Sequence, residues 1–127
     1  MNIAHIAIWT EDLEAMKDFY TIYFGGVCND KYVNPIKKFE SYIITFDSGA
    51  NLELMHMDSI SKSLYAEERT GISHIAFAQG TENAVLSLTE RLRSDGFRIV
   101  GEPRTTGDGY FESVILDVEG NRIELTV

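Results

Sequence analysis

One order of features occurs twice along this chain of 127 residues. A short stretch of alternating apolar residues carries a histidine, a polar or acidic segment then starts a helix, and a glycine ends that helix. Seven positions separate His5 from Asp12, and seven also separate His74 from Thr81. Self-similarity of this kind indicates two copies of one supersecondary unit, because a unit this small cannot bury its apolar face alone.

Both helices have recognisable ends in the sequence. Thr10 or Asp12 is expected to cap the first helix, whose apolar residues recur at helical spacing until the glycine pair that starts at Gly25. Thr81 is expected to cap the second helix, which should end at Gly96. The side chains predicted to be buried are Leu13, Met16, Tyr20, Tyr23 and Phe24 in the first helix and Val85, Leu88 and Leu92 in the second.

Three strand-like runs follow each helix. They cover about 27–33, 39–46 and 51–57 in the first half, and about 98–102, 110–116 and 121–127 in the second. The expected fold is α+β, with two β-α-β-β-β modules whose curled mixed sheets surround a metal cleft and carry the helices outside. The whole chain, 1–127, would be a single domain with module one at about 1–57, a linker at about 58–71 and module two at about 72–127.

The composition is that of a soluble globular protein and argues against several kinds of partner. The formal net charge of −9, from 11 basic and 20 acidic residues, disfavours nucleic acid and anionic membranes. No apolar run approaches the roughly 20 residues that span a bilayer. The N-terminus lacks the basic start of a secretory signal, and a single cysteine, Cys28, allows no internal disulfide. These features predict a cytoplasmic location.

Each half places a histidine in its first strand and a glutamate in its last. Forty-eight positions separate His5 from Glu53, and fifty separate His74 from Glu124. Because side chains alternate along a strand, both glutamates should lie on the face opposite their apolar neighbours, where both histidines are also expected. Two histidines and two glutamates at symmetric positions predict one divalent metal site with open positions for water.

Taken singly, each of these residues has a plainer interpretation. A glutamate on an alternating strand usually faces solvent, and a histidine in an apolar strand is usually a satisfied core group. The chain has three histidines, however, and two of them occupy equivalent positions of the repeat. His56 has the opposite parity to Glu53 and is expected to face away from the site. Cys28 is expected to be a small buried side chain. Glu112 shares parity with Val114 and could reach the cleft, but it follows a glycine-containing loop and is not included in the predicted site.

The segments around these residues resemble the vicinal oxygen chelate superfamily and, within it, the short glyoxalase I-like proteins. The resemblance covers essentially the whole chain and rests on the segments HIAIWTEDLEAMKDFY, NLELM, ISHIAF and ESVILDVEGNRIEL. In glyoxalase I the metal ligands are His or Gln, Glu, His and Glu. The resemblance places them on His5, Glu53, His74 and Glu124, and it implies the same paired modules.

Three positions depart from the glutathione-using members of that family. Their usual arginine, four residues after the first ligand, is Trp9 here, and their usual asparagine, four residues after the first glutamate, is Met57. The closing turn, commonly Asp-Pro-Asp-Gly, is Asp-Val-Glu-Gly at residues 117–120. The metal ligands are therefore kept while the usual glutathione contacts are absent.

The resemblance implies a metal-dependent lyase of the lactoylglutathione lyase, or glyoxalase I, type. Such an enzyme detoxifies methylglyoxal and similar 2-oxoaldehydes by converting their thiol hemithioacetals into 2-hydroxyacyl thioesters. Glu124 is expected to be the base, with Glu53 assisting, although the symmetry leaves their order open. Ni²⁺ or Co²⁺ is favoured as the ion, with Zn²⁺ as the alternative, and the protein is expected to be a homodimer. The pocket residues expected are Trp9, Tyr42, Ile44 and Val114.

Three other activities stay open. A fosfomycin-type thiol transferase has a threonine where this chain has Ala7 and does not use the middle glutamate, although the TGDGYFES stretch is similar to its cation-binding loop. An iron-dependent ring-cleaving dioxygenase is usually longer and has further cleft histidines. A drug-sequestering protein of the bleomycin-resistance type needs no metal ligands. The sequence does not determine the thiol, the aldehyde, the native metal, or whether the site forms within one chain or across a dimer.

Overall fold

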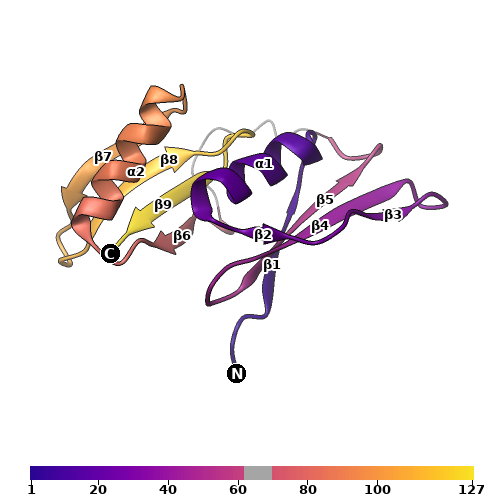
Figure 1. Cartoon of the computed structure of the whole chain (residues 1–127), viewed down its shortest axis with the longest axis horizontal. Helices are drawn as coiled ribbons and strands as arrows, with labels where there is room; N and C mark the ends of the chain where they lie inside the picture. The colour runs from indigo at the N-terminus through magenta and orange to yellow at the C-terminus, as the bar shows by residue number, and fades with distance from the viewer. Residues whose placement is uncertain (62–69) are drawn as a thin grey trace. The chain divides into compact units, whose positions relative to one another are not determined.

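The computed structural model describes residues 1–61 and 70–127. The chain divides into two compact units, Met1–Tyr65 and Ala66–Val127. Each unit is a mixed sheet with one helix against one of its faces (Figure 1). The predicted α+β class and the two β-α-β-β-β modules are thereby confirmed. The predicted linker, about 58–71, lies mostly outside the described residues, so its extent stays a prediction.

The first unit is built on a five-stranded sheet. The strand order is β1-β5-β4-β2, with β3 also pairing with β4. β1 and β5 are parallel, and the other pairs are antiparallel. The elements in chain order are β1 (His5–Trp9), α1 (Leu13–Phe24), β2 (Val27–Cys28), β3 (Tyr32–Asn34), β4 (Phe39–Thr45) and β5 (Asn51–Met57).

The second unit repeats this plan on a four-stranded sheet. The strand order is β6-β9-β8-β7, and the first and last strands of the module are again parallel neighbours. Because the parallel pair recurs, the start of the first strand lies beside the last strand in both units. The elements in chain order are β6 (Ile75–Ala78), α2 (Glu82–Ser94), β7 (Ile99–Thr105), β8 (Phe111–Leu116) and β9 (Arg122–Thr126).

The strand predicted at about 27–33 is interrupted at Asn29 and forms the separate strands β2 and β3. The backbone N–H of Asn29 donates to the carbonyl oxygen of Ile43 at 3.1 Å. The side-chain oxygen of Asn29 accepts from the N–H of Ile43 at 2.7 Å. An asparagine side chain competes in this way with the regular ladder of backbone hydrogen bonds. The prediction of one continuous strand was therefore wrong.

The helix ends follow the capping residues in the sequence. Asp12, rather than Thr10, caps α1, and its side chain accepts from a backbone N–H three residues on, at 2.9 Å. Gly25 ends α1 with a positive φ of 66°, a conformation that glycine adopts without strain. Thr81 caps α2, which ends with Asp95 as its C-cap, one residue before the predicted glycine. Neither helix of the described residues is long and apolar enough to cross a membrane.

Each helix packs one side against its sheet. In α2, Thr89 rather than Leu88 is fully buried, because its hydroxyl is satisfied inside the unit. Thr89 Oγ1 donates to the carbonyl oxygen of Val85 at 2.7 Å and bonds to Ser113 Oγ at 2.7 Å. The fully or nearly fully buried apolar side chains of the helices are Leu13, Met16, Phe19, Tyr20, Val85 and Leu92, whereas Tyr23, Phe24 and Leu88 are only partly buried.

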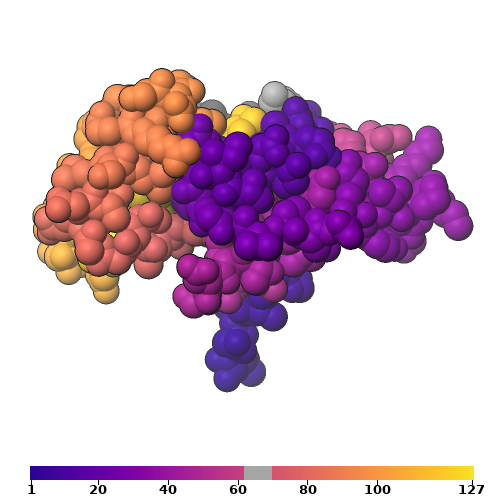
Figure 2. Space-filling view, in the orientation of Figure 1, coloured from indigo at the N-terminus to yellow at the C-terminus, as the bar shows by residue number. Residues whose placement is uncertain are grey.

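The first strand is shorter than the alternation of residues predicts. Ile3 lies before β1, and the N-terminal end of the chain projects from the first unit in Figure 2. The N–H of Asn51 donates to the carbonyl oxygen of Ala4 at 3.0 Å, and β1 then begins at His5. His5 is therefore at the very start of the strand that carries it.

Candidate metal centre

In the first unit, His5 and Glu53 lie on the face of the sheet that α1 does not cover, which we call the helix-free face. In the parallel register Ala7 lies opposite Glu53, so His5 is the diagonal neighbour of Glu53. His5 Nε2 lies 3.8 Å from Glu53 Oε2. Leu52 and Leu54, on either side of Glu53, are buried. The alternation of the strand thus directs the carboxylate away from the core.

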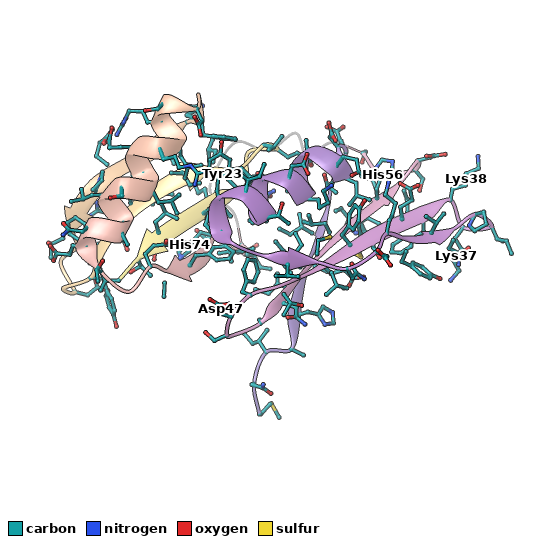
Figure 3. The ribbon with its side chains drawn as sticks, viewed as in Figure 1. Tyr23, Lys37, Lys38, Asp47, His56 and His74 are labelled. Atoms are coloured by element: carbon teal, nitrogen blue, oxygen red, sulfur yellow. The ribbon has the colours of Figure 1, made fainter. Side chains whose placement is uncertain are left out.

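The second unit contains the same arrangement. Ala76 lies opposite Glu124 in the parallel register, and His74 directly precedes β6 (Figure 3). His74 Nε2 lies 3.5 Å from Glu124 Oε2. Ile123 and Leu125 flank Glu124 and are fully buried. Each compact unit therefore presents one histidine–glutamate pair on the helix-free face of its sheet.

Both nitrogen–oxygen separations suit two ligands of one ion. With bond lengths of about 2.1 Å, two ligand atoms lie about 3.0 Å apart at a right angle and about 4.2 Å apart on opposite sides of the ion. The separations of 3.8 Å and 3.5 Å fall between these limits. Imidazole nitrogen and carboxylate oxygen are ordinary ligands of divalent first-row metals. In the described residues no group of three or more ligating side chains forms, so neither unit alone supplies more than a pair.

Glu124 has an environment that favours its protonated form. Burial raises the pKa of Glu124, and repulsion from the carboxylate of Glu112 raises it further, while His74 acts in the opposite direction. The Glu124 side chain is 17% exposed. A carboxylate with a raised pKa accepts a proton more readily, which is the property needed in a general base.

Val114 and Ile43 occupy equivalent positions in the two units. Val114 on β8 lies directly opposite Glu124, and Ile43 on β4 lies directly opposite Glu53. Opposite residues of an antiparallel pair share a face of the sheet. Val114 is thus on the helix-free face, where it was expected, and its contribution to a substrate pocket stays a prediction.

Tyr42 and Ile44 are the two predicted pocket residues that the structure contradicts. Both pair with buried leucines of β5 and lie on the face opposite to Glu53. The Tyr42 hydroxyl donates to the carboxylate of Glu14 on α1, at 3.1 Å. Alternation along β4 does not determine which of its residues share a face with Glu53, because that depends on the register between β4 and β5. Ile43 is the residue of this strand that shares a face with Glu53.

Trp9 lies at the end of β1, on the same face as His5. It is half exposed and lies opposite Met55 in the parallel register. Its ring meets Phe39 edge to face, and Phe39 also contacts the ring of Tyr32, both with centroids 6.1 Å apart. We call Trp9, Phe39, Met55 and Tyr32 the aromatic platform. Only Trp9 was identified from the sequence, because the other members depend on the pairing of β3, β4 and β5.

His56 faces away from the pair formed by His5 and Glu53, as its parity predicts. Its Nδ1 donates to the carbonyl oxygen of Thr10 at 2.8 Å, and its Nε2 lies 4.0 Å from Asp58 Oδ1. It borders a hollow of about 300 Å³ in the first unit, near the tip of the β3–β4 hairpin. None of the four predicted ligands lines this hollow. The lining residues are Val33, Asn34, Pro35, Lys38, Phe39, Glu40, His56 and Asp58.

Cys28, predicted to be a small buried side chain, is half-buried in β2. Its Sγ donates to the carbonyl oxygen of Asn29 at 3.2 Å. Burial raises the pKa of the Cys28 thiol, and the Lys17 ammonium acts in the opposite direction. A raised pKa keeps the thiol protonated near neutral pH, and the thiolate is the nucleophilic form. These surroundings argue against a nucleophilic role for Cys28.

Solved structures of glyoxalases are similar to this chain over nearly its whole length. Glyoxalase I from Zea mays is 25% identical with a TM-score of 0.81, and the match covers 98% of this chain but 44% of the maize chain. A glyoxalase family protein from Enterococcus faecalis is 22% identical with a TM-score of 0.80, covering 99% and 97%. The trypanothione-dependent glyoxalase I of Leishmania major is 24% identical with a TM-score of 0.76, covering 99% and 86%.

No match was found among curated proteins. A family model described as the Glyoxalase/Bleomycin resistance protein/Dioxygenase superfamily matches residues 2–125. This range includes all strands and helices of both units apart from the last residue of β9. It also includes His5, Glu53, His74 and Glu124. The chain belongs to the Glyoxalase/Bleomycin resistance protein/Dioxygenase superfamily.

Proposed function

We propose that this protein is a metal-dependent lyase of the glyoxalase I type. Its substrate is the hemithioacetal of a 2-oxoaldehyde and a small thiol, and its product is a 2-hydroxyacyl thioester. The observation that carries the proposal is the histidine–glutamate pair found on the helix-free face of both units, His5 with Glu53 and His74 with Glu124. Membership of the superfamily and a fold similar to glyoxalase I from Zea mays support it.

The proposed metal site consists of His5, Glu53, His74 and Glu124, which hold one divalent ion with water at the open positions. Ni²⁺ or Co²⁺ is proposed, with Zn²⁺ as the alternative. The two pairs meet either within one chain or between the two chains of a homodimer. The bound ion supplies Lewis-acid stabilisation of the negative charge that develops on the substrate oxygens when the C–H proton leaves.

The proposed role of Glu124 is to move that proton. Its carboxylate takes the proton from the thiol-bearing carbon of the hemithioacetal and returns it to the neighbouring carbon. The hydroxyl proton passes from the oxygen of the first carbon to the oxygen of the second, so substrate and product contain the same atoms. The raised pKa of Glu124 supports this role, because the carboxyl must hold the proton between the two transfers. Glu53 is proposed to supply negative charge beside the ion and to hold the arrangement of the ligands around it.

Glutathione is proposed to be a poor thiol for this enzyme. Trp9 and Met57 stand where the glutathione-using relatives have an arginine and an asparagine, and neither side chain carries a positive charge or an amide group. The glyoxalase I of Leishmania major is described as trypanothione-dependent, so the thiol differs among proteins of this fold. The expected partner is a different small thiol or an adduct bound through its apolar part.

Metal analysis and turnover, on protein purified without chelator or affinity tag, test the proposal together. We expect about one divalent ion per chain, and loss of turnover after chelation that the ion restores. His5→Ala and His74→Ala are expected to lose most of the metal, whereas His56→Ala, at the histidine outside the site, keeps it. Metal binding at the parent level in both His5→Ala and His74→Ala would refute the proposal. A drug-sequestering protein would show neither metal dependence nor turnover.

A further inference from the structure

Val114 lies between two different neighbours on the helix-free face of the second sheet. Its strand, β8, is in the middle of β7 and β9. On one side Val114 is directly opposite Glu124 of β9, and on the other side it is directly opposite Gly101 of β7. Opposite residues of an antiparallel pair share a face of the sheet. Val114 therefore separates Gly101 from the residue proposed as the base.

The side chain of Val114 occupies the space that a side chain at position 101 would need. A Cβ atom at Gly101 would lie 3.1 Å from Val114 Cβ and 3.2 Å from Val114 Cγ2, whereas 3.4–4 Å is ordinary van der Waals contact. Gly101 does not have a positive φ, so its backbone conformation is open to other residues. The reason for a glycine here is thus its neighbour, Val114, and not the backbone.

Strand β7 is irregular on both sides of Gly101. Its register with β8 shifts between Ile99 and Gly101 and again between Gly101 and Arg104. Irregularities of this kind bend a strand and change the direction of its side chains, and they are frequent beside active sites. Between the two shifts, the aligned residue of β7 is the glycine that faces Val114.

The first unit has an irregularity at the equivalent place. Ile43 lies directly opposite Glu53, and on its other side Asn29 interrupts the outer strand and bonds to the backbone of Ile43. In both units a break in the outer strand therefore lies beside the aliphatic residue that faces a proposed metal-binding glutamate. In the second unit the break also removes a side chain, so room is left there for Val114.

The space beside Glu124 is where the aldehyde would be recognised. Under the proposed function Glu124 returns the proton to the carbon that carries the side group of the aldehyde, so that group lies next to Glu124. Opposite side chains of an antiparallel pair have Cβ atoms about 4.5–5.5 Å apart. Val114 is β-branched, so its χ1 is stiff and a push from β7 moves the whole side chain toward β9.

We propose that Gly101 is a positioning residue that, through Val114, determines the size of the aldehyde that the enzyme accepts. The missing Cβ allows Val114 to stand clear of Glu124, which leaves space for the side group of the aldehyde. This inference rests on the proposed function. Gly101 does not touch the substrate and acts through Val114.

The test compares hemithioacetals of phenylglyoxal and methylglyoxal with the same thiol, as a ratio of their kcat/KM values. Gly101→Ala should lower this ratio at least ~3-fold and Val114→Ala should raise it ~10-fold, because a change of one or two methyl groups in an apolar pocket alters discrimination on this scale. Gly107→Ala is the matched control. It adds the same methyl group in the β7–β8 loop, where a Cβ has no such contact within 4 Å, and should leave the ratio unchanged.

The double variant Gly101→Ala/Val114→Ala separates contact with Val114 from other effects. Because the methyl groups of Val114 are then absent, the added Cβ should change the ratio much less than it does in the parent. An unchanged ratio in Gly101→Ala, or an equal drop in both backgrounds, would overturn the inference. Thermal unfolding shows whether each variant is folded. If Gly101→Ala does not fold, Val114→Ala decides, and a ratio that does not rise in it would overturn the inference.

Crystal structures of the metal-free parent and of Gly101→Ala test the positioning without substrate or metal. Val114 is expected to move toward Glu124 by a few tenths of an ångström. An unmoved Val114, with β7 displaced outward instead, would contradict the positioning role. A parent protein that turns over no hemithioacetal would refute the proposed function, and the place of Val114 in Gly101→Ala would still decide whether Gly101 positions it.

Discussion

Trp9 and Phe39 meet edge to face, with ring centroids 6.1 Å apart and ring planes at 90°. Met55 lies opposite Trp9, and Glu53 is two residues before Met55 on the same face of β5. An apolar surface thus adjoins the first histidine–glutamate pair. The glutathione-using relatives have an arginine at the position of Trp9. We expect the apolar group of the substrate to contact this surface.

Trp9→Ala is expected to raise KM for hemithioacetals that carry a large apolar group. KM should rise about tenfold. This corresponds to ~1.4 kcal/mol of binding free energy, the scale of one aromatic contact. Trp9→Phe keeps a ring at this position and should be close to the parent. Comparing phenylglyoxal and methylglyoxal adducts of the same thiol measures the effect. Equal losses for the two aldehydes, or none, would contradict contact with the apolar group.

Exchanging the carboxylates for amides should distinguish the two glutamates. Glu124→Gln removes the basic group and is expected to lower kcat at least ~10²-fold, the usual scale for a positioned general base, with metal at least partly retained. Glu53→Gln should have the smaller effect on kcat, because its main task is to hold charge around the ion. Both variants should be measured fully loaded with metal. An equal loss, or a larger one for Glu53→Gln, would reverse the assignment.

The choice of thiol can be measured directly. Methylglyoxal hemithioacetals of glutathione and of several other small thiols are compared by kcat/KM, which reports the difference in transition-state binding. Glutathione is expected to rank low, because Trp9 and Met57 offer no charge or amide group to its carboxylates. Turnover with glutathione in the usual enzymatic range would show that other residues replace the missing contacts.

A homodimer with shared sites can be recognised by mixing inactive chains. If each metal site takes one pair from each chain, His5→Ala and His74→Ala chains together contain one undamaged site per heterodimer. Activity should then return after subunit exchange. Because one of the two sites of each heterodimer is intact, its activity should be at most half that of the parent dimer. Size-exclusion chromatography and a tagged partner confirm the exchange. Confirmed exchange without recovered activity would place both pairs of a site in one chain.

Glu14 should make the stability of the first unit depend on pH. The Lys31 ammonium holds the pKa of the Glu14 carboxyl below its usual value of 4.5, burial acts in the opposite direction, and hydrogen bonds from Lys17 and Tyr42 lower it further. Since the folded-state pKa is the lower one, this stabilisation is present above about pH 4.5 and is lost as the pH falls through the folded-state value.

Urea unfolding of Glu14→Gln at pH 7 and at pH 3 measures this contribution. The variant is expected to have a lower free energy of unfolding than the parent at pH 7, and the difference should shrink at pH 3. Glu82→Gln removes the same charge from the first turn of α2 and is the control. A difference of equal size at both pH values would show that ionisation of Glu14 is not the cause.

The repeated order of strands and helices was visible in the sequence because it depends on local signals. Alternating residues indicate the strands, and Asp12, Gly25 and Thr81 indicate helix ends. The prediction that Tyr42 and Ile44 line the pocket was wrong. Which residues of two strands share a face depends on the turn between the strands. A local alternation pattern contains no information on that turn, so the shared face is known only from the register of the paired strands.

The break at Asn29 has a related cause, because it depends on a partner, Ile43, in another strand. The irregular register between β7 and β8 is likewise absent from the alternation of either strand. Contacts across strands, rather than along them, are what the sequence pattern did not contain.

The aromatic platform and Glu124 belong to different copies of the repeat, and this separation affects how such a protein can evolve. Trp9, Phe39 and Met55 are in the first unit, whereas His74 and Glu124 are in the second. Under the proposed function, substitutions in the platform can change the preferred thiol or aldehyde without altering the residue proposed as the base. Natural selection can then act on substrate choice in one copy while the other copy keeps the proposed base.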